Sequence, residues 1–251
     1  MSCVRLWQRV INRYQWSLLT LLARRNLRMT NRTPIVSFTF DDFPRSALHV
    51  GGQILRAQGF AGTYYASLGL MDQDSPSGRI FSAPDLETLI AQGHELGCHT
   101  FAHCNAWRTS PDVFEASILE NRRALSRLLP HVSFETLSYA IGNPHLRIKR
   151  RAGHYFACCR GGWQRFNRGT IDLNNVLAYF LEKSRGPESI QAIIEQNRAV
   201  NGWLVFATHD ISEQPTQFGC TRALFEQVVQ WAADSGARIL PVARALEEVS
   251  T

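Results

Sequence analysis

Two adjacent aspartates and a pair of histidines are the residues of this sequence whose types and spacing indicate chemistry. Asp41 and Asp42 directly follow the apolar run at residues 35–40 (IVSFTF), and His99 precedes His103 by four positions. Two imidazoles at this spacing lie on one face of a helical turn, where they can bind one metal ion. A divalent cation held by one carboxylate and both imidazoles would relieve the repulsion between neighbouring buried carboxylates. It would also leave a position open for water, which the second carboxylate could deprotonate.

Each part of this pattern has another interpretation when it is taken alone. One aspartate could be the N-cap of a following helix, and the two histidines could be ordinary core or surface residues. Cys98 and Cys104 flank the histidines and would complete a structural zinc site of two cysteines and two histidines. However, Cys98 should point away from His99 if both lie on a strand. The combination of the two motifs therefore favours a catalytic metal site.

Further polar residues follow a second strongly apolar run. Residues 203–208 (WLVFAT) are followed by His209 and Asp210. In parallel α/β folds, the side chains at the carboxyl ends of the strands converge on one site. We therefore expect His209 to lie near the aspartates and the other two histidines.

The elements that must position these residues alternate between strands and helices. Apolar and β-rich runs predict strands, and cap residues with helical spacing predict helices between them. The predicted strands are 35–40, 62–67, 95–100, 136–140, 154–159, 203–208 and 238–240, and the predicted helices are 46–58, 82–92, 110–130, 187–200, 221–235 and 242–249. This order predicts an α/β fold of about seven parallel strands, either a closed or nearly closed β/α barrel or an open doubly wound sheet. No glycine-rich loop follows the first strand, which weighs against nucleotide binding there.

Charge divides the chain of 251 residues into two predicted parts. The net charge is +6, but seven arginines precede Asp41, the first acidic residue. The remainder has 20 basic and 21 acidic residues, and a nearly neutral body gives no support for a nucleic-acid partner. We predict a basic amphipathic segment at residues 1–33 and a catalytic domain at residues 34–251.

The N-terminal segment resembles neither a signal peptide nor a membrane-spanning helix. Its apolar run at residues 16–23 is far shorter than the roughly 20 residues that cross a bilayer, and no cleavage site follows it. We predict an amphipathic helix over residues 4–27. It either packs on the domain or lies, through residues 1–30, on an anionic inner membrane leaflet. Six cysteines without a CxxC pair indicate reduced thiols, so the expected location is cytoplasmic, with peripheral contact to the inner face of the membrane as one possibility.

Three segments together resemble the polysaccharide deacetylase family, also called the NodB-homology domain or carbohydrate esterase family 4. Residues 39–42 (TFDD) and 99–103 (HTFAH) match its first two motifs, T-F-D-D and H-[S/T]-x-x-H. Residues 204–209 (LVFATH) are similar to its C-terminal L-x-x-x-x-H segment. The resemblance covers about residues 34–245 and implies a distorted (β/α) barrel. It also implies a metal-dependent hydrolase that removes an acetyl group from an N- or O-acetylated sugar of a polysaccharide, a glycolipid or their precursor.

The resemblance assigns a role to each residue of the two motifs and to His209. Asp41 would be the general base, and Asp42, His99 and His103 would bind the metal. His209 would be the general acid that protonates the leaving amine. The metal is commonly zinc in this family, and the same ligands also suit other divalent ions such as cobalt, nickel or manganese.

The third motif of the family, R-x-P-Y-G, is altered in this chain. Its counterpart at residues 138–142 (SYAIG) keeps an aromatic residue, Tyr139, and the glycine but lacks the arginine and the proline. The backbone N–H of Ile141 could still stabilise an oxyanion, and Arg160 is our candidate to replace the missing arginine. Trp163 could stack on a sugar, and Asp172 could be the acidic partner of the acid histidine.

Two other functions remain open on the sequence alone. The chain could hydrolyse another non-peptide C–N bond, such as that of a cyclic imide or amide. Alternatively, it could be an inactive deacetylase-like protein that only binds carbohydrate, which the altered third motif favours.

Overall fold

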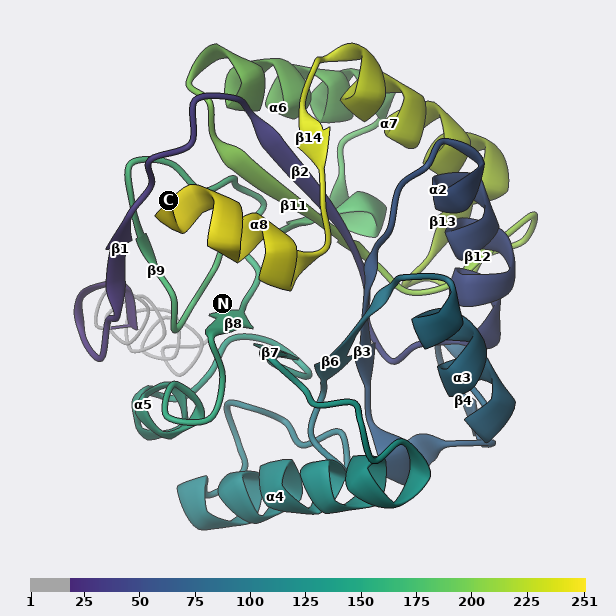
Figure 1. Cartoon of the computed structure of the whole chain (residues 1–251), viewed down its shortest axis with the longest axis vertical. Coiled ribbons are helices and arrows are strands. Elements are labelled where there is room, and N and C mark those ends of the chain that lie inside the picture. Colours follow the sequence, from purple (N-terminus) through teal and green to yellow (C-terminus); the bar gives the residue numbers. More distant parts are fainter. Residues whose placement is uncertain (1–18) are drawn as a thin grey trace, which may run out of the picture.

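The computed structural model describes residues 19–251. Within them, seven parallel strands form a curled half-barrel (Figure 1) in the order β10-β11-β2-β3-β6-β7-β8, and β14 pairs with β2 beside this path. The strands are β2 (Ile35–Phe40), β3 (Thr63–Ala66), β6 (Glu95–Cys98), β7 (Thr136–Ser138), β8 (Cys158–Arg160), β10 (Tyr179–Phe180), β11 (Trp203–Thr208) and β14 (Arg238–Ile239). The two edges of the sheet approach one another, because Trp163 N–H donates to the Ala178 carbonyl just before β10. The predicted barrel of about seven parallel strands is confirmed.

Helices cover the outside of the curled sheet. Figure 1 shows α4 along one side and α6 and α7 along the opposite side, with α8 lying across the strands in front. The helices are η1 (Ala47–Gly52), which continues into α2 (Gln53–Ala57), then α3 (Ala83–Ala91), α4 (Pro111–Leu128), α5 (Leu146–Ala152), α6 (Pro187–Ala199), α7 (Arg222–Asp234) and α8 (Val242–Ser250). None of these is long and apolar enough to cross a bilayer among the residues that the structure describes.

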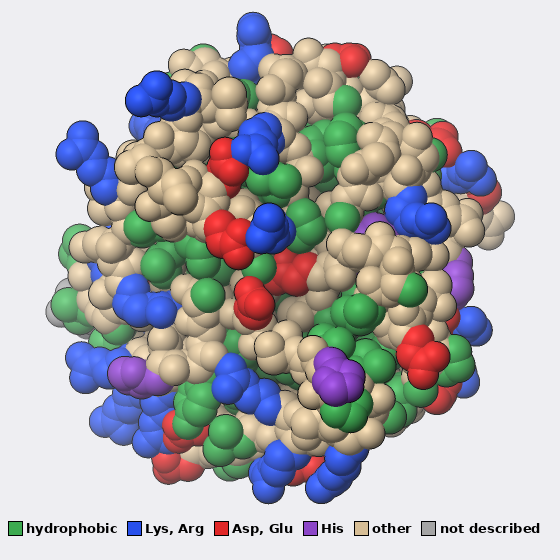
Figure 2. Space-filling view, in the orientation of Figure 1, with side chains coloured by type: hydrophobic (Ala, Val, Ile, Leu, Met, Phe, Trp, Pro, Cys, Tyr) green, Lys and Arg blue, Asp and Glu red, His purple; other side chains and the backbone are tan. Residues whose placement is uncertain are grey.

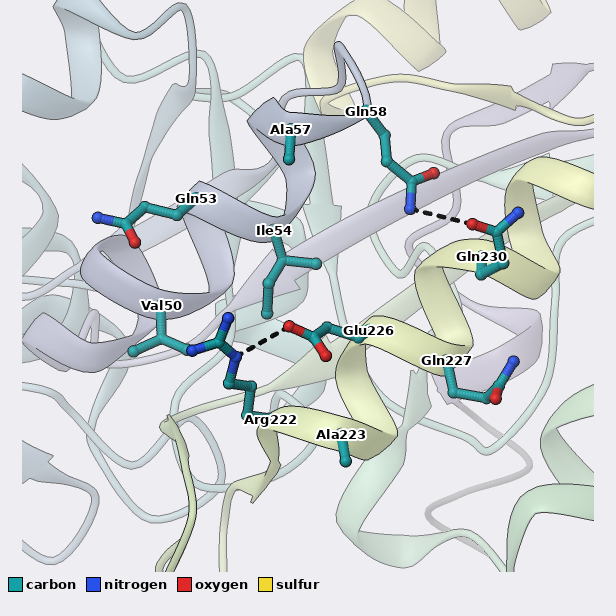
Figure 3. A pocket seen from close by; sticks show the side chains of 10 residues that line it. All are labelled: Val50, Gln53, Ile54, Ala57, Gln58, Arg222, Ala223, Glu226, Gln227 and Gln230. Carbon is teal, nitrogen blue, oxygen red and sulfur yellow. Dashed lines mark hydrogen bonds and ion pairs between the residues drawn. The ribbon is translucent and has the colours of Figure 1, made fainter.

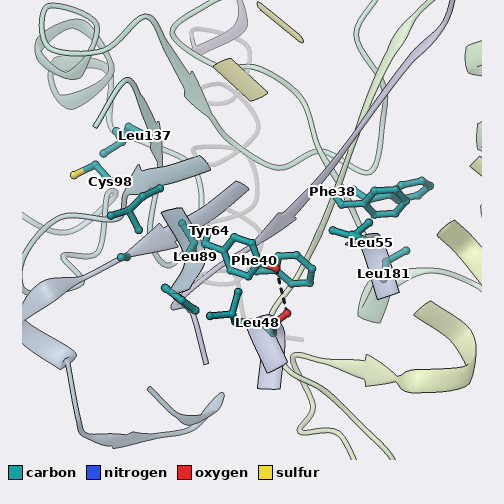
Figure 4. Packing of buried hydrophobic residues seen from close by; sticks show 14 of the residues in the cluster. Phe38, Phe40, Leu48, Leu55, Tyr64, Leu89, Cys98, Leu137 and Leu181 are labelled. Carbon is teal, nitrogen blue, oxygen red and sulfur yellow. Dashed lines mark hydrogen bonds between the residues drawn. The ribbon is translucent and has the colours of Figure 1, made fainter. Parts of the chain in front are cut away.

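The strands are buried on both faces, as expected for a parallel sheet with helices outside. Side chains alternate along β2, so that Phe38 and Phe40 pack outward against the helices while Ile35 points into the barrel with Cys158 and Trp203. On the outer side Phe40 stacks on Tyr64, with 4.6 Å between ring centroids (Figure 4). The position of a residue along a strand therefore decides whether it reaches the interior of the barrel.

Cysteines in the described residues are free thiols. Cys158 and Cys159 lie in two different apolar clusters, because adjacent residues on a strand point to opposite faces. Burial raises the pKa of the Cys159 thiol to about 12, so this side chain stays protonated and behaves as an apolar core residue.

The predicted N-terminal helix over residues 4–27 is wrong at its C-terminal end. Residues 19–21 are helical, but Ala23 adopts a positive φ of 51°. A short strand, β1 (Asn26–Arg28), follows and pairs antiparallel with β9 (Thr170–Asp172). The rest of that prediction lies outside the described residues.

A buried lysine fastens this segment to the domain. Lys149 on α5 donates from Nζ to the carbonyl of Leu22 at 2.9 Å and to that of Leu19 at 2.5 Å. The same Nζ lies 2.6 Å from Asp172 Oδ2. The carboxylate of Asp172 is therefore used to hold residues 19–25 on the domain, and the structure does not place it beside His209 as an acidic partner.

Candidate active site

The alternation of side chains brings the candidate residues together inside the barrel. Asp41 continues the inward-facing set of β2, and His209 continues that of β11. His99 follows β6 by one residue, while Ser138 on β7 and Arg160 on β8 are directly paired in register. All these strands run parallel, so their carboxyl ends meet at one end of the barrel. The expected convergence of these residues is therefore present.

The three candidate metal ligands form a compact cluster. Asp42 Oδ1 lies 2.9 Å from His103 Nε2 and 3.5 Å from His99 Nε2. One ligand atom from each residue lies within 4.8 Å of the other two. Asp42 and His99 are buried, and His103 is partly exposed. The cluster therefore has its ligands inside the fold and one side open toward solvent.

The backbone around these ligands differs from the helical turn that the i, i+4 spacing predicted. Thr100 and His103 have positive φ angles of 62° and 49°. They lie in a tight turn after β6, which is held by a bond from Cys104 N–H to Thr100 Oγ1. Asp42 also has a positive φ, of 60°. Such left-handed conformations are costly for residues other than glycine and are concentrated at functional sites.

The hydrogen bonds around the cluster leave His99 Nε2 and Asp42 Oδ1 available to ligate a cation. His99 Nδ1–H donates to the Ser138 carbonyl at 2.9 Å, so its Nε2 carries the lone pair that faces Asp42. Ser77 donates to Asp42 Oδ2 at 2.8 Å. Asp42 Oδ1 is enclosed, yet it has no hydrogen bond of acceptable geometry. An enclosed carboxylate oxygen facing two imidazole nitrogens fits a divalent ion, and the hydrogen-bonded outer groups are typical of such sites.

Two of the three ligands have the protonation state that metal binding needs at neutral pH. Burial alone would raise the pKa of Asp42, but the close approach of His103 Nε2 to its Oδ1 and the nearby imidazoles outweigh burial and hold the pKa far below its ordinary value. Burial lowers the pKa of His99 to about 4. The carboxylate is therefore ionised and His99 is neutral, as metal ligation requires. Burial alone would lower the pKa of the third ligand, His103, but the Asp42 carboxylate outweighs burial and raises it, so an ion would displace a proton there.

Asp41 has a separate set of partners. Arg160 Nη2 donates to Asp41 Oδ1 and to Ser138 Oγ, and the Ser138 hydroxyl donates to the same Asp41 oxygen at 3.1 Å. Burial alone would raise the pKa of Asp41, but the guanidinium and the nearby imidazoles hold it below its ordinary value. Arg160 thus stands where we expected a substitute for the arginine of the third motif, and it keeps the carboxylate ionised.

His209 completes the site from the β11 side. Its Nδ1 lies 3.1 Å from the Phe218 carbonyl, to which it can only donate. Its positive charge would act on both aspartates, because it lowers the pKa of Asp41 and that of Asp42. Nε2 is consequently the nitrogen left to exchange a proton with a substrate.

The structure places the remaining candidate residues for oxyanion and substrate binding differently. Ile141 has a positive φ of 52°, and no group of the described residues accepts its backbone N–H. Tyr139 is not brought to the site, because it points to the opposite face from Ser138 and donates from its hydroxyl to the Asn174 carbonyl. Trp163 lines a separate hollow of about 740 Å³ with residues such as Arg24 and Arg168.

Cys98 and Cys104 do not join the metal ligands in a structural zinc site. Cys98 is buried in the outer core, where its Sγ accepts hydrogen bonds from Asn121 and from Thr100 N–H. The candidate metal-binding cluster of the described residues contains neither cysteine. The alternative zinc site of two cysteines and two histidines is therefore wrong.

Glu182 is a residue of the site that sequence reasoning missed. The register of β10 on β11 pairs Phe180 with Ala207, and Glu182 and His209 each follow this pair by two residues. Glu182 lies in the short 3-10 helix η3 (Leu181–Lys183) that follows β10. Burial raises the pKa of Glu182 to about 7 although the charge of His209 lowers it. No sequence pattern identified β10, because it has only two residues.

Another hollow, of about 710 Å³, lies between α2 and α7 (Figure 3). Its lining includes Gln58 and Gln230, bonded to one another, and the exposed pair Arg222 and Glu226. None of the site residues lines it, so the chemistry of the chain belongs to the end of the barrel.

A curled half-barrel of seven parallel strands is the fold of NodB-like deacetylases. The model of the polysaccharide deacetylase family matches residues 28–155, which confirms the resemblance. The chain belongs to the polysaccharide deacetylase family. Among curated proteins, none matches the sequence.

Solved structures share the fold at low sequence identity. A family 4 acetyl xylan esterase from Clostridium thermocellum, in complex with a cobalt ion, is 15% identical with a TM-score of 0.59, covering 85% of this chain and 90% of that one. The chitin deacetylase of Colletotrichum lindemuthianum is 16% identical with a TM-score of 0.62, covering 87% and 89%. A CE4 family pseudoenzyme from Bacillus anthracis is 10% identical with a TM-score of 0.61, covering 88% and 68%. At these identities the likeness establishes the fold.

Removing Arg160 tests the electrostatic arrangement around Asp41. The variant Arg160→Ala leaves a buried carboxylate without its cation, so we expect the free energy of unfolding at pH 7 to fall by about 3–5 kcal/mol. The loss should shrink as the pH falls, because in the variant the folded protein takes up a proton on Asp41 more readily than the unfolded chain does. Urea unfolding at pH 7 and pH 5 measures both effects.

Arg222→Ala is the matched control, because Arg222 forms an exposed ion pair with Glu226 and exposed pairs contribute at most about 1 kcal/mol. If Arg160→Ala were as stable as this control at pH 7, Arg160 would not be what keeps Asp41 ionised.

Proposed function

We propose that this chain is a metal-dependent hydrolase that removes an acetyl group from an N-acetylated or O-acetylated sugar of a polysaccharide, a glycolipid or their precursor. The observation that carries the proposal is the pairing of two differently held carboxylates: Asp42 faces two imidazoles, and Asp41 faces a guanidinium. One carboxylate is thereby suited to ligate a metal, while its neighbour is kept ionised as a base. Membership of the polysaccharide deacetylase family supports the same substrate class.

Asp42, His99 and His103 would hold the ion. A divalent ion bound there supplies a Lewis acid that polarises the acetyl carbonyl and lowers the pKa of a bound water toward neutrality. The donor set suits zinc, and it also suits cobalt, nickel or manganese. The cobalt ion in the acetyl xylan esterase structure supports the choice of a divalent transition metal.

Asp41 and His209 divide the proton transfers. Arg160 and Ser138 both bond to Oδ1 of Asp41, which leaves Oδ2 to take the proton from the attacking water. His209 presents Nε2 and gives its proton to the leaving amine, which is a poor leaving group until it is protonated. The unaccepted N–H of Ile141 is the candidate donor to the oxyanion that forms on the acetyl oxygen.

The other readings of the sequence are outcomes of the same test. An inactive carbohydrate-binding protein would bind an acetylated sugar without releasing acetate, and the likeness to a pseudoenzyme fold keeps this outcome relevant. Hydrolysis of a cyclic imide or amide would appear as turnover of that substrate in place of the acetylated sugar.

Replacing the base tests the proposed reaction. We expect the zinc-loaded protein to release acetate from N-acetylglucosamine oligomers and Asp41→Asn to lower that rate by about 10²–10⁴-fold, because this is the usual contribution of a general base. Asp74→Asn, at an exposed acid, is the control and should keep full activity. Acetate release by Asp41→Asn within threefold of wild type would exclude Asp41 as the base, and metal-loaded wild type that released no acetate would favour the binding protein.

We further propose that the chain acts in the cytoplasm and touches an anionic membrane surface through its N-terminal region. Leu21 and Leu22 are 70% and 44% exposed, and Arg24 and Arg28 next to them are exposed as well. Lys149 holds this segment beside α5, and Lys and Arg side chains gather on the surface over α5 at the lower left of Figure 2. Exposed leucines bordered by cations are complementary to an anionic lipid headgroup layer.

The double variant Leu21→Ser, Leu22→Ser tests this membrane contact. We expect it to bind phosphatidylglycerol-containing vesicles at least about tenfold more weakly than wild type, since each leucine would lose about 1 kcal/mol of apolar burial. Co-sedimentation measures the binding, with Val113→Ser on α4 as a control at another exposed apolar residue. Equal binding of the double variant and wild type would contradict the proposal.

A further inference from the structure

The general acid proposed above depends on which nitrogen of His209 carries its hydrogen. A backbone carbonyl can only accept a hydrogen bond, so the Phe218 oxygen at 3.1 Å from Nδ1 requires a hydrogen there. The lone pair or the transferable proton is then at Nε2, as the reaction needs. The carbonyl is neutral, so it fixes the tautomer without adding a charge to the imidazole. The carboxylate we had expected in that place, Asp172, is bound to Lys149 instead.

The Phe218 carbonyl is held in place by the neighbour of His209. The carboxylate of Asp210 accepts the backbone N–H of Thr216 at 2.8 Å through Oδ2, and the hydroxyl of Thr216 at 2.6 Å through Oδ1. Thr216 Oγ1 in turn accepts the N–H of Phe218 at 3.2 Å. One buried side chain therefore fixes the loop from which the carbonyl projects.

The two ends of this loop are also joined to one another by backbone hydrogen bonds. Residues Ile211–Ser212 form β12, which pairs with β13 (Cys220–Thr221), and Cys220 N–H donates to the Asp210 carbonyl at 3.0 Å. A Cβ at Gly219 would lie 2.3 Å from both the carbonyl oxygen and Oδ1 of Asp210. The loop is thus packed so tightly on Asp210 that its position depends on that residue.

The described residues show no other role for the Asp210 side chain. Its side chain is buried, with 5% of its surface exposed, and it takes part in no ion pair among residues 19–251. It does not reach the metal-binding cluster. Its carboxylate oxygens are both used by Thr216.

We propose that Asp210 is a positioning residue for catalysis, which acts by clamping the 210–220 loop through Thr216 so that the Phe218 carbonyl fixes the tautomer and direction of the His209 ring. This inference rests on the proposed function, in which His209 protonates the leaving group. Asp210 itself touches neither substrate nor metal in this account. Replacing Asp210 should therefore slow the step in which the leaving group is protonated. It should also change the tautomer of the His209 ring.

The first readout is the tautomer of His209, which does not depend on activity. Long-range ¹H–¹⁵N spectra of the zinc-loaded protein distinguish Nδ1–H from Nε2–H imidazole. We expect Nδ1–H in wild type and a mixture of tautomers in Asp210→Ala. Thr216→Val, which keeps its backbone N–H but loses the hydroxyl, should give an intermediate mixture, and Thr216→Ser should restore the wild-type signal.

The second readout is the dependence of turnover on the leaving group. For N-acetylglucosamine oligomers, Asp210→Ala should lower kcat by about 10–100-fold with KM little changed, the usual cost of removing a group that orients a working side chain. For an activated aryl acetate, whose leaving group needs no proton, the rate should change by less than about threefold. Glu213→Ala is the matched control, at an exposed acid in the same loop, and should leave both rates unchanged.

The outcomes separate this inference from the proposed function. A wild-type tautomer in Asp210→Ala and Thr216→Val would overturn the clamp, whatever the activity of the protein. If Asp210→Ala lowered the rates on the amide and on the aryl ester equally, Asp210 would have only a general structural role. If Asp210→Ala did not fold, Thr216→Val would carry both readouts. If wild type released no acetate, the proposed function would fail while the spectra still decided whether the loop sets the tautomer.

Discussion

Two adjacent carboxylates buried at the end of one strand are the constraint on which the rest of this site depends. Two like charges in the interior cannot both stay ionised unless each has a cation of its own. The protein separates them by turning the backbone at Asp42, where φ is 60°. Asp41 then continues inward to Arg160, while Asp42 faces two imidazoles. The proposed base and the proposed metal ligand are thus neighbouring residues with separate partners.

Arg160, on the strand next to the altered third motif, supplies the guanidinium that contacts Asp41. Ser138 stands where the third motif of the family has arginine, and Arg160 is its directly paired neighbour on β8. The small hydroxyl of Ser138 leaves room for the guanidinium and shares its bond to Asp41. Parallel register therefore allows the strand next to the altered motif to bring a guanidinium to Asp41.

Strands that are apolar runs followed by ligand-type residues were predicted correctly from the sequence. Features that depend on packing between distant segments of the chain were not. The strands that end at Asp41, His99 and His209 were predictable, because each is an apolar run followed by a polar residue. The two-residue β10 that carries Glu182 toward the site has no periodicity to detect. The spacing of His99 and His103 suggested a helical turn, but strained backbone after β6 brings the rings together instead. Asp172 and Tyr139 were misplaced because their partners, Lys149 and Asn174, lie far away in the sequence.

The metal content of the purified protein tests the central claim most directly. After incubation with zinc and removal of free ions, wild type should retain about one ion per chain by elemental analysis, because Asp42, His99 and His103 supply a three-residue site with an open position. His103→Ala should lose it, whereas His154→Ala, at an exposed histidine, should keep it. Wild type without bound metal, or His103→Ala with the full amount, would contradict the account of why two carboxylates are buried side by side.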